Sequence, residues 1–125
     1  MVKPYSKNAK KHPDKQLKAI ARSIKEFGWR QPIVVDKKNE IIVGHGRWFA
    51  YEKYGKHLKL AEPWIEKAST LTPQQVKAYR LADNKLNESE WAMDLAVEEL
   101  RELDTYHFSL TGFDPDLLVE NDNKE

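Results

Sequence analysis

The segment just before the middle of the chain constrains the fold more than any other. It holds two short β-branched runs, Ile33–Val35 and Ile41–Val43, on either side of a polar turn at residues 37–40. Two such runs separated by a short polar turn predict a β-hairpin. The second run ends at Gly44-His45-Gly46, after which the sequence has helical character up to Gly55. A hairpin that leads directly into a helix is therefore expected.

A helical pattern precedes this hairpin. After Pro13-Asp14, apolar residues recur at helical spacing while lysines occupy the opposite face. We expect Gly28 to end this helix in the left-handed cap conformation. The apolar positions are Leu17, Ile20, Ala21, Ile24 and Phe27.

The clearest helix start lies further along the chain. Thr72 is an N-cap residue, Pro73 takes the first helical position, and Gln75 completes a capping box. We expect this helix to run to about Lys85. The preceding stretch, residues 56–70, has the weakest pattern and supplies at most one more strand around Pro63.

Two further helices are predicted after residue 86. The first runs from Ser89 or Glu90 to Leu103 and packs Trp91, and the second is short and begins at Asp114-Pro115. Together the elements predict an α+β fold with a helical C-terminal half. We expect one domain over residues 1–90, followed by a helical extension over residues 91–125 whose acidic tail frays.

The composition excludes several classes of protein. The 125 residues include no cysteine, which rules out disulfides, thiolate zinc sites, iron–sulfur clusters and cysteine nucleophiles. The sequence has no run of about 18 apolar residues that could span a bilayer, and its first residues have no apolar signal segment. We expect a reducing, cytoplasmic setting.

The net charge of +1 conceals a strong asymmetry along the chain. Residues 1–30 carry nine Lys and Arg against two acids, whereas residues 86–125 carry twelve acids against two basic residues. A basic N-terminal part is typical of proteins that face a polyanion such as DNA; alternatively, the two ends neutralise each other or keep the protein in solution. The candidates for contacts with the DNA backbone are Lys7, Lys10, Lys11 and Lys15.

The most informative stretch for chemistry is the glycine turn, which we define as residues 44–47. A strand, a glycine-broken turn and a helix start together favour anion binding, because backbone N–H groups are left unpaired and the helix dipole attracts negative charge. Arg47 adds a planar, permanently charged donor, and His45 is a candidate phosphate donor or base. The alternative is that the turn simply connects a strand to a helix.

A second polar cluster lies at Asp83, Asn84 and Lys85, where the helix after Thr72 is expected to end. Carboxylate and amide oxygens can hold Mg²⁺ when substrate phosphates complete its shell, and Lys85 is placed to meet such phosphates. The alternative is a solvated helix end, with Asn as its cap and Lys complementing the dipole.

The sequence resembles the N-terminal domain of the ParB/sulfiredoxin superfamily, the ParB-like nuclease domain. Three stretches, 24–28, 31–35 and 41–50, repeat its order of helix, Gln-Pro-Ile strand, hairpin and Gly-x-x-Arg helix start, and Ala-Asp-Asn-Lys-Leu at 82–86 resembles its second phosphate motif. Residues 81–86 and 109–113 are similar to ParB-like domains of phage and prophage proteins and to those fused to DNA methyltransferases. The resemblance implies a small mixed sheet packed with helices.

The resemblance also implies a nucleotide site. Members of the superfamily bind CTP, ATP or ADP, so a nucleoside triphosphate (CTP or ATP) with Mg²⁺ is the implied ligand. Asp83 and Asn84 would contact the metal through the nucleotide, and the base would lie near Gly28, Gln31 and Pro32. The implied phosphate-binding residues are Gly44, His45, Gly46, Arg47, Asn84 and Lys85.

The sequence differs from members of the superfamily in two places, and each difference bears on the expected activity. Partition proteins usually carry two adjacent arginines where this chain has His45, Gly46 and Arg47, so one phosphate-binding arginine is missing. Sulfiredoxin has a catalytic cysteine at the position of His45, so sulfinic-acid reduction is excluded.

Three hypotheses follow for the function. The first is a nucleotide-binding domain in a DNA-associated process (partition, modification or phage DNA handling), acting on DNA or with a DNA methyltransferase or other DNA-processing protein. The second is a Mg²⁺-dependent enzyme (a nuclease, NTPase or phosphotransferase) that uses Asp83 and Asn84, with His45 and Asp83 as catalytic candidates. A single carboxylate at the expected pocket favours binding over cleavage. The third is a protein-interaction module with a vestigial pocket.

Overall fold

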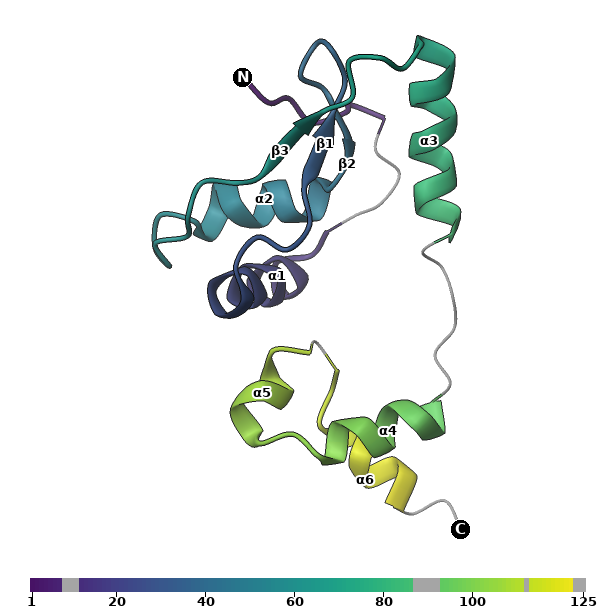
Figure 1. The fold of residues 1–125 in the computed structure, drawn as a ribbon. Coiled ribbons are helices and arrows are strands. Elements are labelled where there is room, and N and C mark those ends of the chain that lie inside the picture. The colour runs from purple at the N-terminus through teal and green to yellow at the C-terminus, as the bar shows by residue number, and fades with distance from the viewer. Residues whose placement is uncertain (8–11, 87–92, 112, 123–125) are drawn as a thin grey trace. The chain divides into compact units, whose positions relative to one another are not determined.

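The computed structural model describes residues 1–7, 12–86, 93–111 and 113–122 (Figure 1). The chain divides into two compact units, residues 1–88 and 89–125.

The first unit is built on a three-stranded mixed sheet. β1 (Ile33–Val35) pairs antiparallel with β2 (Ile41–Val43) and parallel with β3 (Ile65–Lys67), which gives the order β2-β1-β3. The predicted hairpin and the predicted small mixed sheet of an α+β fold are therefore confirmed. The third strand begins two residues after Pro63, at the place where the sequence pattern was weakest.

The hairpin turn is held by one carboxylate. Oδ1 of Asp36 accepts the backbone N–H groups of Lys38 at 2.8 Å and Glu40 at 3.0 Å. Asn39 takes a positive φ of 66°, a conformation that Asn tolerates better than most residues. The turn residues thus fix the register in which Val35 pairs with Ile41.

Two helices pack against each other next to the sheet (Figure 1). α1 (Asp14–Phe27) and α2 (His45–Tyr54) bury Leu17, Ala21 and Ala50 between them. The close approach favours a glycine at position 46, because a Cβ there would lie 3.1 Å from Cδ1 of Ile20 and would push that side chain aside. The helix that follows β2 begins at His45 rather than at Arg47, so His45 and Gly46 belong to the helix and Gly44 is its N-cap.

The end of α1 differs in one detail from the prediction. Gly28 has the positive φ expected of a C-cap, 79°, but its ψ of −178° is extended rather than left-handed helical. Its N–H still donates to the carbonyl of Ile24 at 2.8 Å. The backbone therefore turns away from the helix axis at once and leads into β1.

α3 (Pro73–Leu86) begins with the predicted capping box. The N–H of Thr72 donates to Oε1 of Gln75 at 2.8 Å, and the N–H of Gln75 donates to Oγ1 of Thr72 at 3.2 Å. The helix stands beside β2 (Figure 1). Its buried side chains, Val76 and Arg80, are four residues apart and so share one face.

The described part of the second unit forms three short helices, α4 (Met93–Arg101), α5 (Thr105–Ser109) and α6 (Asp116–Asp122). The predicted start of α4 and Trp91 lie outside the described residues, as do residues 123–125 of the predicted frayed tail. α5 was not predicted; it is capped by Asp104, whose side chain accepts the N–H of His107 at 2.8 Å. The buried residues of this unit are Ala96, Val97, Leu100, Phe108 and Leu110.

Within the parts of the chain that the structure describes, no helix has the length and apolar character needed to cross a membrane.

Candidate functional site

The glycine turn has a backbone that only glycine adopts easily. Gly44 is the N-cap of α2 with φ 102° and ψ 24°, and its carbonyl accepts the N–H of Trp48 at 2.9 Å. A Cβ at this position would lie 3.2 Å from Cα of Ile33 and 3.2 Å from Nη2 of Arg47. A side chain at residue 44 would therefore be strained and would press on β1 and on the arginine.

Arg47 links the glycine turn to the segment before β1. Nη1 donates to Oε1 of Gln31 at 3.1 Å, and Nη2 donates to the carbonyl of Pro32 at 2.8 Å. Its Nε is buried and has no hydrogen-bond partner among the described residues. Burial lowers the pKa of the Arg47 guanidinium, while the carboxylate of Asp83 acts in the opposite direction. The two hydrogen bonds use two of the five N–H groups of the guanidinium and fix it beside the turn.

His45 occupies the first position of α2 but points into the protein. Its side chain is 7% exposed, and its Nε2 accepts the backbone N–H of Tyr5 at 3.0 Å. Burial, together with the charges of Arg80 and His12, lowers the pKa of His45 to about 4. A neutral imidazole whose lone pair is already used is poorly suited to act as a base, so the geometry favours a structural role for His45.

The second predicted cluster lies in the last turns of α3. Asp83 is half-buried and close enough to Arg47 to affect its pKa. Asn84 and Lys85 belong to α3, but their side chains lie outside what the structure describes. Among the described residues, no group of three or more His, Cys, Asp or Glu could hold a metal ion. A Mg²⁺ ion would therefore depend on ligand phosphates for most of its shell.

The structure brings four of the predicted residues to Arg47: Gln31, Pro32, Gly44 and Asp83. At Gly46, an added Cβ would lie 3.1 Å from Cδ1 of Ile20 and 3.2 Å from the His12 ring, so tight packing also favours glycine there. Gly28 is exposed, and no atom lies within 4 Å of a Cβ added there, so its positive φ rather than packing favours glycine.

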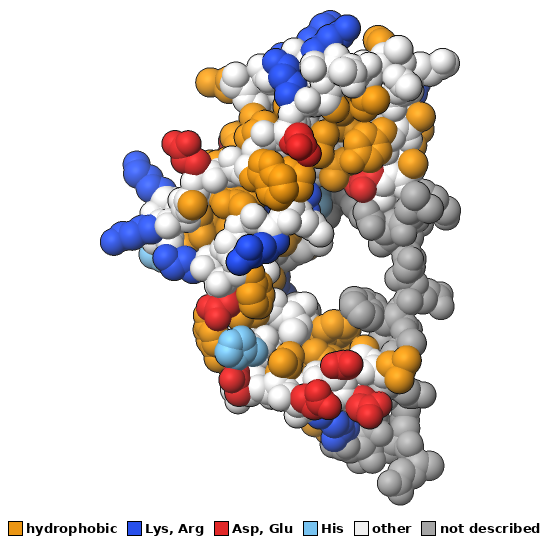
Figure 2. Space-filling view, viewed as in Figure 1, with side chains coloured by type: hydrophobic (Ala, Val, Ile, Leu, Met, Phe, Trp, Pro, Cys, Tyr) orange, Lys and Arg blue, Asp and Glu red, His pale blue; other side chains and the backbone are white. Residues whose placement is uncertain are grey.

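The predicted DNA-contacting lysines are only partly described. Lys7 and Lys15 are exposed, and Lys10 and Lys11 lie outside the described residues. Figure 2 shows Lys and Arg side chains gathered on the first unit around the end of α2 and at the hairpin turn. Most of the charged side chains visible on the second unit in Figure 2 are acidic.

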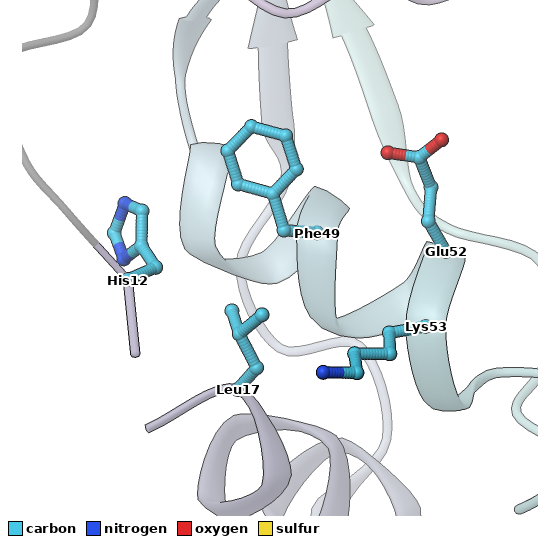
Figure 3. Close-up of a pocket in the computed structure, with 5 residues that line it drawn as sticks. All are labelled: His12, Leu17, Phe49, Glu52 and Lys53. Carbon is cyan, nitrogen blue, oxygen red and sulfur yellow. The ribbon is translucent and has the colours of Figure 1, made fainter. Parts of the chain in front are cut away.

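A separate groove lies between α1 and α2 (Figure 3). It has a volume of about 420 Å³ and is lined by His12, Leu17, Phe49, Glu52 and Lys53. Lys53 extends toward Leu17 from the end of α2, and Glu52 points away from it. None of these five residues was predicted for the phosphate site.

Sequence reasoning missed Arg80 and Tyr5. Arg80 is 8% exposed and stacks on Tyr5, with its guanidinium carbon 3.6 Å from the ring centroid. Its spacing of four from Val76 placed it on the buried face of α3, which was the one available signal. Its partner Tyr5 is too distant in sequence for any local pattern to reveal the pair.

Comparisons with known proteins agree on one family. A family model described as the ParB N-terminal domain matches residues 2–79. The ParB-like nuclease domain-containing protein YnaK of Escherichia coli (strain K12) is 40% identical over 74 residues, which make up 59% of this chain and 80% of YnaK.

A solved structure has a similar fold. It is the C-terminally truncated chromosome-partitioning protein ParB from Caulobacter crescentus complexed with CTP-gamma-S. The TM-score is 0.71 at 17% identity, and the match covers 94% of this chain and 69% of that chain. At this identity the similarity establishes a shared fold.

Proposed function

This chain belongs to the family of ParB N-terminal domains, and on that premise we propose that it binds a nucleoside triphosphate and acts in a DNA-associated process. The observation that carries the proposal is Arg47. A half-buried guanidinium, held in place by two hydrogen bonds, lies against a glycine turn at a helix N-terminus, which is an arrangement that favours phosphate oxygens. The ParB protein of similar fold was crystallised with a CTP analogue, which supports CTP as the first ligand to test.

In this proposal the phosphates contact the backbone N–H groups of residues 44–47 and the guanidinium of Arg47. Mg²⁺ is held by the phosphates, with Asp83 and Asn84 as protein contacts, and Lys85 adds a positive charge. The base lies near Gln31 and Pro32, which Arg47 already holds beside the turn, and near Gly28. The first unit carries this site, and the helical extension follows it as a separate part.

The DNA-associated part of the proposal rests on the basic N-terminal segment. Replacing Lys7, Lys10, Lys11 and Lys15 by Ala should weaken binding of duplex DNA and flatten its salt dependence, because each phosphate contact releases a counterion. The matched control removes four other lysines: Lys37, Lys38, Lys56 and Lys59, all exposed. Equal losses in both variants would mean that overall charge, not this segment, attracts the DNA. A DNA methyltransferase or another DNA-processing protein remains the proposed partner class.

The experiment that tests the nucleotide site is calorimetric titration of CTP, ATP, GTP and ADP with Mg²⁺. We expect one triphosphate to bind and Arg47→Ala to abolish the heat. No binding of any nucleotide would overturn the proposal and leave the interaction-module hypothesis. Phosphate release and nuclease assays on the same samples then separate a binding domain from an NTPase, phosphotransferase or nuclease.

A further inference from the structure

The N-terminal strap, which we define as residues 2–5, joins the hairpin to the glycine turn. The N–H of Lys3 donates to the carbonyl of Asn39 at 2.8 Å, and the N–H of Ile41 donates to the carbonyl of Lys3 at 2.8 Å. Two residues further on, the N–H of Tyr5 donates to Nε2 of His45 at 3.0 Å. The strap is therefore fixed at one end to the hairpin and at the other to the first residue of α2.

Arg80 contacts Tyr5, the residue that joins the strap to His45. Its guanidinium carbon lies 3.6 Å from the centroid of the Tyr5 ring, and Nη2 donates to the carbonyl of Ile41 at 2.9 Å. The carboxylate of Glu40 lies 3.8 Å from the same nitrogen. A buried arginine needs such partners, since an uncompensated charge in the interior is strongly unfavourable. Tyr5 is thus stacked under a cation that is itself anchored to β2 and α3.

We propose that Arg80 is a positioning residue for the glycine turn: by stacking on Tyr5 it holds the Tyr5 N–H against His45 and so fixes the start of α2 where phosphates would bind. The consequence for nucleotide affinity rests on the proposed function. The effect is one of preorganisation, because a turn that is already fixed loses less conformational freedom when a ligand binds. Arg80 acts here through its contacts with Tyr5, Ile41 and Glu40.

The arrangement requires a neutral His45. If Nε2 were protonated, the Tyr5 N–H would lose its acceptor and two positive charges would face each other. The charged or titratable groups around the ring are Arg80 from α3, His12 from the segment before α1 and Tyr5 from the strap. The two cationic or basic neighbours both disfavour the imidazolium. Protonation of His45 at low pH should therefore release the strap and weaken nucleotide binding.

The first test observes His45 directly and needs no nucleotide. In ¹⁵N-labelled protein we expect the His45 ring to carry its proton on Nδ1 and to titrate well below free histidine. Arg80→Lys keeps the charge but loses the planar stacking surface, so we expect mixed tautomers and a pKa that moves toward the ordinary value. Tyr5→Phe keeps both the ring and the N–H and should match the wild type. An unchanged His45 signal in Arg80→Lys would overturn the inference.

The second test measures the nucleotide that the wild type binds best. We expect Arg80→Lys to weaken affinity by about tenfold, as supporting residues around a site commonly do, and Tyr5→Ala to weaken it similarly. In the double variant the losses should not add, because both changes break the same contact. Additive losses, or wild-type affinity in Arg80→Lys, would contradict the role of Arg80. If Arg80→Lys does not fold, Tyr5→Ala takes its place in both tests, because it removes the same stacking contact.

The two proposals fail in different ways. A wild-type protein that binds no nucleotide overturns the proposed function, and the His45 signal in Arg80→Lys then decides by itself whether Arg80 orders the turn. Nucleotide binding that is lost in Arg47→Ala but unchanged in Arg80→Lys and Tyr5→Ala overturns this inference alone.

Discussion

At the C-terminal end of α2, Lys53 and the Tyr54 hydroxyl both contact one carboxylate, Asp14, whereas at the N-terminal end the Nε–H of Arg47 is buried without a hydrogen-bond partner among the described residues. The pKa values reflect the difference. Hydrogen bonds from Lys53 and Tyr54 lower the pKa of Asp14 because they favour its charged form. Burial lowers the pKa of Arg47 and works against its charged form.

The comparison separates a structural polar cluster from a candidate binding site. Asp14, Lys53 and Tyr54 satisfy one another and tie the start of α1 to the end of α2. The glycine turn has a glycine with positive φ, a buried histidine and a buried arginine N–H without a hydrogen-bond partner among the described residues. Groups that a fold leaves incompletely paired are the ones on which a ligand can act. The following predictions test whether the two ends differ in this way.

We expect the largest effect on the free energy of unfolding when the pH is lowered. His45 has an ordinary pKa of 6.5 when unfolded and about 4 when folded, so between these values the unfolded chain binds more protons. The stability from His45 is complete above pH 6.5 and falls as the pH drops, by about 3 kcal/mol near pH 4. Urea unfolding at pH 7 and pH 4.5 measures the loss.

His45→Gln supplies the control for this titration. Its amide oxygen can still accept the Tyr5 N–H, but the side chain does not titrate in this range. We expect the stability of this variant to change much less between pH 7 and pH 4.5. An equal loss in both proteins would mean that His45 is not the group responsible. Asp14, at the other end of α2, should lose its contribution only when the pH falls below its ordinary value of 3.8.

Gly44→Ala should come next in size. A side chain at φ 102° is strained, and its Cβ would lie 3.2 Å from the backbone of Ile33. We expect unfolding free energy to fall by about 2 kcal/mol, together with weaker nucleotide binding. Gly55, at the other end of α2, has an ordinary helical backbone with φ −58°. The backbone strain expected from a side chain therefore applies to Gly44 and not to Gly55, and chemical denaturation of Gly44→Ala measures it. Wild-type stability would show that the turn relaxes without cost.

The matched pair Arg47→Gln and Lys53→Gln removes one positive charge from either end of the same helix. Loss of a charged donor to phosphate should raise the Kd of the preferred nucleotide about tenfold or more in Arg47→Gln. Lys53→Gln should leave the Kd near the wild-type value. Calorimetry measures the Kd of both variants. Equal losses of affinity would mean that net charge rather than the turn attracts the nucleotide.

Asp14→Asn should have the smallest effect. It removes the shared partner of Lys53 and Tyr54, but this cluster is exposed, and exposed ion pairs contribute little to stability. We expect a small decrease in Tm and no change in nucleotide affinity. A large loss of affinity would break the distinction between the two ends of α2.

Local patterns predicted much of the fold. The capping box at Thr72 and Gln75 and the hairpin around Asp36 depend on residues within a few positions of one another, so the sequence revealed them. β3 was harder, because all three of its residues are exposed and its partner β1 lies some thirty residues earlier. No alternation of buried and exposed positions marks such a strand.

The candidate site was predictable only in part. The residues of the glycine turn, Arg47 included, form one short motif, and their residue types predict an anion site. His45 was a candidate base because it lies in that motif, but its environment comes from Tyr5 and Arg80, which are distant in sequence. Burial and pairing by remote residues set its pKa, and a single sequence does not show them.

The most direct test of the account is a ¹H–¹⁵N NMR titration of the wild-type protein with CTP and Mg²⁺, read at the two ends of α2. The account predicts the largest amide shifts at residues 44–48 and little change at residues 53–55. Shifts confined to the C-terminal end of α2 or to the groove at His12 and Phe49, or no shifts with CTP or with ATP, would contradict it.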